Sequence, residues 1–265
     1  MSKKMSNAPV YYALAQAKFN PVAAMGNKYI KDVQDAFRLM GYTLFEPQER
    51  KQLQFSANLG QLPAEPKIET KLFWLITEMN RKSGFILDQS SLVFHTTHYE
   101  TNEKFIPELL EGLEAVHQIV RLEHVSRLGL RYLNAVIPGN KEHVEQYLSS
   151  GLHGIKFGSH PKYSLYESVF ETSKNPKSTL IARIHCSTDV LGYPPDMAPN
   201  GLLPMERFNR NEKITHAVID TDHYLEDRMK IDFKQLKSQL KTLHTGIKHV
   251  FAAISTEHAT NIWKK

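Results

Sequence analysis

The feature that most constrains the fold of this chain is a long apolar stripe near its C-terminus. Over about 232–254, apolar residues recur at the three- and four-residue spacing of an α-helix. The residues of the stripe are Leu236, Leu240, Leu243, Ile247, Val250, Phe251 and Ile254. A helix with so continuous an apolar side needs a broad apolar surface to cover. The stripe therefore predicts a C-terminal helix that covers much of a sheet, which favours one structural body.

Short apolar or alternating runs supply the strands of that sheet. The expected strands cover 10–19, 44–45 with a continuation at 52–55, 71–80, 84–88, 91–99, 125–137, 163–172, 178–187 and 213–224. Several runs are separated only by short polar turns, and this spacing is typical of an antiparallel meander. Segments 58–67 and 192–211 contain glycines and prolines without periodicity, so we expect loops there.

Helical periodicity outside the C-terminal stripe predicts further helices at about 27–40 and 102–121, and a shorter one at 141–149. Strands that follow one another, interrupted by three longer helices, indicate an α+β fold with a mainly antiparallel sheet and helices packed on it. We expect a single domain over 1–265. A division into two lobes near 138–141 remains the alternative, and no internal sequence repeat joins the two halves.

Composition narrows the function only slightly. The net charge of +5 is compatible with an anionic partner but does not require one, so protein and nucleic-acid partners both stay open. No apolar run approaches the roughly 18 residues of a membrane span, and no signal-peptide pattern follows Lys3 and Lys4. We therefore expect a cytoplasmic protein without a membrane partner. Cys186 is the only cysteine, so an intramolecular disulfide is excluded, and we expect no cofactor.

The most suggestive motif contains Arg127, Gly129 and Arg131. Residues two apart in a strand share a face, so two guanidinium groups should flank an open stretch of backbone at the glycine. This arrangement suits a phosphate or a carboxylate, and we name Arg127, Arg131 and the nearby Asn134 as candidate anion- or partner-binding residues. The alternative is that both arginines pair with Asp or Glu on neighbouring elements and hold the fold together.

A second motif contains Asp220 and Asp222, which share one face of a predicted strand. Paired carboxylates can hold Mg²⁺ or Mn²⁺ weakly beside a phosphate, and this is the only candidate metal site that the sequence offers. No other carboxylate stands at an obvious ligand spacing. A strand end that faces solvent explains the same two residues and is the more common case.

The thirteen histidines form no metal-binding or nucleophile motif. No phosphate-binding loop, dinucleotide fingerprint, Gly-X-Ser-X-Gly motif or kinase signature occurs either. The catalytic residues therefore stay unknown. An enzyme of this sequence would have to use histidine as a metal-independent acid or base.

Three stretches resemble an uncharacterised prokaryotic family of about this length. They are Ala8 to Val22, Arg127 to Asn134, and Leu243-His244 followed by Phe251 and Trp263. The family is distributed sporadically among bacteria and archaea and has no assigned chemistry, so it supplies no site residues. A patchy distribution fits mobile or defence-associated genes, and that setting is what the resemblance implies.

The first hypothesis for function is a non-enzymatic macromolecule-binding protein in a prokaryotic defence or toxin–antitoxin setting. The second is a metal-independent nucleic-acid-processing enzyme, with histidine as acid or base beside Arg127 and Arg131. The third is a small-ligand-binding domain with a pocket under the 192–211 segment. The sequence does not decide between these hypotheses, and it leaves the oligomeric state open.

Overall fold

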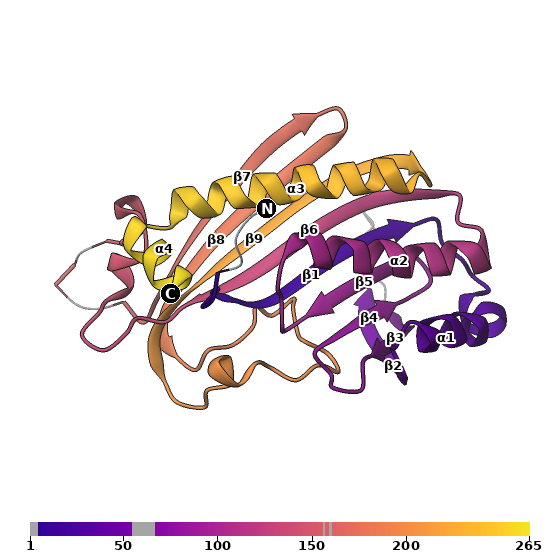
Figure 1. Cartoon of the computed structure of the whole chain (residues 1–265), viewed down its shortest axis with the longest axis horizontal. Helices are drawn as coiled ribbons and strands as arrows, with labels where there is room; N and C mark the ends of the chain where they lie inside the picture. The colour runs from indigo at the N-terminus through magenta and orange to yellow at the C-terminus, as the bar shows by residue number, and fades with distance from the viewer. Residues whose placement is uncertain (1–4, 55–66, 156, 159–160) are drawn as a thin grey trace, which may run out of the picture.

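The computed structural model describes residues 5–54, 67–155, 157–158 and 161–265. Its described strands form one nine-stranded antiparallel sheet with the order β2-β3-β4-β5-β1-β6-β9-β8-β7 (Figure 1). The strands are β1 (Val10–Phe19), β2 (Leu44–Gln54), β3 (Lys67–Thr77), β4 (Ser83–Leu87), β5 (Ser91–Thr96), β6 (His124–Val136), β7 (Tyr163–Lys174), β8 (Lys177–Asp189) and β9 (Ile214–Lys230). The α-helices are α1 (Ile30–Leu39), α2 (Asn102–Val120), α3 (Phe233–Ile254) and α4 (Glu257–Lys264).

The two halves of the sheet share one arrangement around the central strands β1 and β6. In each half the chain leaves the central strand, runs to an edge of the sheet, and returns strand by strand until β5 pairs with β1 and β9 pairs with β6. Each half then places a long helix, α2 or α3, on the same face of the sheet (Figure 1). Because β1 and β6 are antiparallel, the two halves are related by an approximate two-fold rotation.

The main core lies between the sheet and these helices. Leu236, Leu240 and Leu243 of the predicted stripe are buried on the inner side of α3, which packs against β6, β9 and α2. Gly246 allows α3 to approach β9 closely, because a Cβ at that position would lie 2.6 Å from the ring of the buried His223. The contacts of α3 with the sheet are with β6, β8 and β9, so its covering of the sheet as a whole stays a prediction.

The opposite face of the sheet carries no α-helix of the described chain, and we call it the helix-free face. One end of it is crossed by the segment between β8 and β9, residues 190–213, which we call the strap (orange in Figure 1). Apolar strap residues pack on Tyr11 and Tyr12 of β1 and on Leu133 of β6. These strap residues are Leu191, Met197, Leu202 and Phe208. They occupy part of the space beneath 192–211, and the small-ligand hypothesis stays a prediction.

The α+β class and the antiparallel sheet are confirmed, and the differences are local. In place of the expected helix over 141–149 there are two short 3₁₀ turns, Val144–Gln146 and Ser150–Leu152. Besides its local turn bonds, the backbone there is tied to the junction of α3 and α4: Ser149 N donates to Ile254 O, and Thr256 N donates to Tyr147 O. β9 is also longer than expected, because both its neighbours continue to pair with it.

Two further observations bear on the sequence expectations. The loop expected at 58–67 lies outside the described residues, apart from Lys67 at the start of β3. In the part of the chain that the structure describes, no helix is long and apolar enough to cross a membrane.

Candidate functional site

A cluster of charged side chains lies at the centre of the helix-free face, at the border of the strap. We call it the arginine cluster, because Arg127 and Arg131 of β6 lie in it. Arg131 of β6 stands opposite Asp222 of β9. Asp220, two residues before Asp222 on the same strand, stands opposite Arg183 of β8. The alternation of the strands brings these side chains to one face, as the sequence predicted for the arginines and for the aspartates. The structure therefore unites the two predicted motifs in one cluster.

Arg131 is the centre of this cluster and is almost fully enclosed. Its Nε and Nη2 donate to the two carboxylate oxygens of Asp220 at 2.8 and 2.7 Å. Its Nη1 donates to Asp196 of the strap at 2.5 Å. Burial alone would lower the pKa of Arg131, but the hydrogen bonds to Asp220 and Asp196 outweigh it and raise that pKa. The same bond from Arg131 lowers the pKa of Asp196. Arg131 thus fastens the strap to the sheet.

Arg127 lies four residues away on the same face of β6 and is less enclosed. Its Nη1 donates to Glu226 at 2.7 Å, and its guanidinium lies 3.8 Å from the ring centre of Tyr224. Gly129 leaves room between the two arginines, because a Cβ there would only touch Tyr224 at 3.4 Å. Both arginines therefore pair with acidic side chains, as the structural alternative predicted. Binding of an anion by Arg127 and Arg131 stays a prediction.

Asn134 and Asp222 differ in how they relate to the arginines. Asn134 points to the helix-covered face, where its amide donates to the Ile219 carbonyl at 3.3 Å, so it does not join the cluster. Asp222 lies in the cluster, half-buried, and burial raises the pKa of its carboxyl. It makes no hydrogen bond or ion pair with any other described residue.

The predicted weak metal site at Asp220 and Asp222 receives no further ligand from the described part of the chain. Both oxygens of Asp220 accept from Arg131, and Arg183 Nη1 lies 3.5 Å from one of them. Among the residues that the structure describes, no group of three or more His, Cys, Asp or Glu is placed to hold a metal ion. Metal binding by this pair stays a prediction.

The histidines lie apart from the arginines. No described histidine is hydrogen-bonded or ion-paired with Arg127 or Arg131. His95 of β5 is fully buried on the strap side, with Nδ1 2.9 Å from the Tyr12 hydroxyl, and its Nε2 has no partner among the described residues. Burial lowers the pKa of His95 to about 3. His95 is therefore a neutral core residue at ordinary pH.

We expect His95 to make the fold sensitive to acid. The unfolded chain takes up a proton on this histidine below about pH 6.5, whereas the folded protein resists protonation down to about pH 3, so stability falls as the pH falls through this window. The loss is about 1.4 kcal/mol per pH unit. Urea unfolding at several pH values should show that His95→Gln loses stability more slowly with falling pH than the wild type. Equal pH slopes would contradict the assignment.

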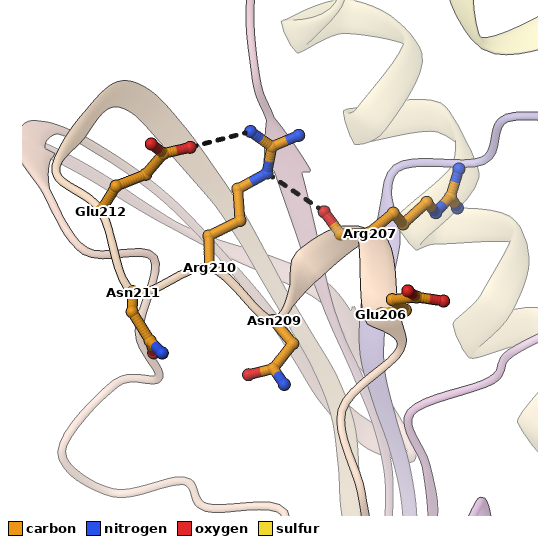
Figure 2. Close-up of a pocket in the computed structure, with 6 residues that line it drawn as sticks. All are labelled: Glu206, Arg207, Asn209, Arg210, Asn211 and Glu212. Atoms are coloured by element: carbon orange, nitrogen blue, oxygen red, sulfur yellow. Dashed lines mark hydrogen bonds and ion pairs between the residues drawn. The ribbon is translucent and has the colours of Figure 1, made fainter.

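The described part of the surface includes two hollows that are large enough to hold a small molecule. One, of about 440 Å³, is formed by 206–212 of the strap, where Arg210 bonds to the Arg207 carbonyl and lies 3.6 Å from Glu212 (Figure 2). The other, of about 620 Å³, lies between the end of α2 and the ends of β6 and β9. Its lining includes His117, Arg228 and Lys230. Figure 2 shows the first hollow as an open loop of polar side chains. Neither lining includes Arg127, Arg131 or their acidic partners.

The most exposed apolar region is the edge strand β7 with the residues just before it. Of the eleven large apolar side chains that are exposed in the described chain, six fall within 155–170. They are Ile155, Phe157, Tyr163, Leu165, Val169 and Phe170. The β7–β8 hairpin projects past α3, and β7 has one side without a neighbouring strand (Figure 1). Sequence reasoning found the strand but not this surface, because apolar alternation does not distinguish an edge strand from a central one.

Comparison with known proteins leaves the family of the chain open. A scan against models of protein families gave no match, and a search of curated proteins gave none either. The resemblance to the sporadically distributed prokaryotic family therefore stays an expectation.

Proposed function

We propose that this chain is a non-enzymatic, cytoplasmic binding protein that takes a protein partner onto the free edge of β7. The observation that carries the proposal is the concentration of exposed apolar side chains at 155–170. Contiguous apolar surface is rare on proteins that work alone and marks interaction sites. A prokaryotic defence or toxin–antitoxin setting remains part of the proposal and rests on the family resemblance alone.

The contrast between the two edges of the sheet supports this proposal. β2, at one edge, carries Pro47 and a run of charged residues, Glu49, Arg50 and Lys51. Proline and charge are the devices by which proteins block unwanted strand pairing. β7 is one residue longer and contains no proline, and beside Glu167 and Glu171 it exposes apolar side chains on both faces. Its open backbone groups can pair with an added strand, which is a common way of binding an extended segment.

The arginine cluster serves a structural role in this proposal. Arg131 holds the strap on the sheet, and the strap covers the face beside the cluster. The second hypothesis, a metal-independent enzyme using histidine beside Arg127 and Arg131, gains no support from the described contacts. It stays a prediction that assays with single-stranded and double-stranded nucleic acid can test.

We expect the edge of β7 to select extended peptides. Display libraries of random peptides of about ten residues should yield binders whose affinity falls about tenfold or more for the variant Val169→Lys, because a lysine on an edge strand opposes strand addition. Val169 is 60% exposed, so the substitution should leave the fold intact. Fluorescence anisotropy with the selected peptides measures the affinities.

The matched control is Met79→Lys. Met79 is 78% exposed after the end of β3, far along the sheet from β7, and the substitution changes hydrophobicity and charge in the same way. Selected peptides should bind this variant as well as the wild type. If selection yields no peptide that distinguishes Val169→Lys from Met79→Lys, the proposed function is wrong.

A further inference from the structure

The two faces of β7 differ in chemistry at its free edge. Toward the helices it presents Tyr166, Ser168 and Phe170, and toward the helix-free face it presents Glu167, Val169 and Glu171. This division follows from the pairing with β8, in which Tyr166 stands opposite the buried Ile184 and Glu167 stands opposite Arg183. An added strand would meet both patterns at once, because side chains directly opposite one another in paired strands are in contact.

The two glutamates leave negative charge at this edge. Glu167 accepts from Arg183 Nε at 2.5 Å, but its side chain is still about half exposed. Glu171 is exposed and has no hydrogen bond or ion pair with any described residue. Both carboxylates lie on the helix-free face with Val169 between them, so positive charge on an added strand would find two partners four residues apart.

We propose that the partner segment is an extended strand with two basic residues four positions apart and three apolar or β-branched residues between them. The basic residues stand opposite Glu171 and Glu167, and the central apolar residue stands opposite Val169. The two remaining residues face Phe170 and Ser168 on the helix side. This inference rests on the proposed function and adds the chemistry of the partner to it.

A second copy of the chain fits this edge less well. With antiparallel self-pairing centred on Ser168, the four glutamates of two β7 strands gather on one face, at diagonal positions within reach of one another. Centring the pairing on Val169 places Glu167 directly opposite Glu171, and centring it on Glu167 places that residue opposite itself. Like charges facing each other destabilise a strand pair. The charge pattern therefore favours a basic partner over a copy of itself.

A pair of synthetic peptides tests the inference. One has the core Lys-Tyr-Val-Thr-Lys, and the other replaces both lysines with glutamate. Anisotropy titrations at low salt should show that the lysine peptide binds about tenfold more tightly than the glutamate peptide, and added salt should reduce this difference. The variant Glu171→Lys should narrow or reverse the preference. The control Glu49→Lys, with the same change of charge on the opposite edge strand, should keep it.

The outcomes separate the inference from the proposed function. If both peptides bind equally and Val169→Lys abolishes both, the edge binds strands but the basic partner is wrong. If neither peptide binds while library peptides still distinguish Val169→Lys from Met79→Lys, the basic pattern is again wrong and the proposed function stands. If analytical ultracentrifugation shows a dimer that Val169→Lys dissociates, a second copy occupies the edge, and the inference is overturned.

Discussion

Replacing Arg131 with methionine should lower the free energy of unfolding by about 3–5 kcal/mol, because the substitution leaves a buried carboxylate without its main counter-charge. The side chain of Asp220 is only 5% exposed, and both of its oxygens accept from Arg131. The variant also releases Asp196 and with it one attachment of the strap. Urea unfolding followed by circular dichroism measures the loss.

Two companion variants show whether the ion pair itself is responsible. Arg127→Met should cost only about 1–2 kcal/mol, since its partner Glu226 is half exposed and the contact with Tyr224 is modest. The double variant Arg131→Met/Asp220→Leu should recover part of the stability, because the most deeply buried carboxylate is removed together with its counter-charge. A small loss for Arg131→Met, together with weaker binding of an anionic partner, would restore the anion-site hypothesis.

Replacing Leu240 with alanine should cost about 2–5 kcal/mol, which is typical of a large side chain removed from a well-packed core. Leu240 is fully buried on α3, the helix that packs against β6, β9 and α2. Through α2 these contacts reach the first half of the fold, and through β6 and β9 they reach the second half. If residues 1–265 form a single cooperative domain, the substitution should therefore destabilise both halves equally.

The two tryptophans make this test possible. Trp74 is buried in β3 of the first half, and Trp263 is buried in α4 after the second half. In the variants Trp263→Phe and Trp74→Phe, fluorescence reports on one half at a time. We expect Leu240→Ala to shift both unfolding midpoints together, as coincident probes require of a two-state transition. A shift confined to the Trp263 probe would show two lobes that unfold separately, as the division near 138–141 allowed.

Local pattern was sufficient to predict most elements of the fold. The stripe on α3, the alternation of β1 and the short turns of β3 to β5 each depend on residues close together in the chain, so periodicity and turn chemistry reveal them. The same reasoning placed Arg127 and Arg131 on one face, and Asp220 and Asp222 on one face. It did not show that these two pairs meet, since that depends on the pairing of β6 with β9.

By itself, the sequence determined the class of the fold, its antiparallel sheet and the faces of its strands, because these follow from side-chain period and from turns within a few residues. Only the tertiary structure decided what each polar residue does. Arg131 forms ion pairs with Asp220 and Asp196, which are 89 and 65 residues away in the sequence. The side chain of Asn134 lies on the other face of the sheet. Only the order of the strands left β7 at an edge without a partner. Pairing between distant segments is set by the packing of the whole sheet, and no local pattern in the chain encodes it.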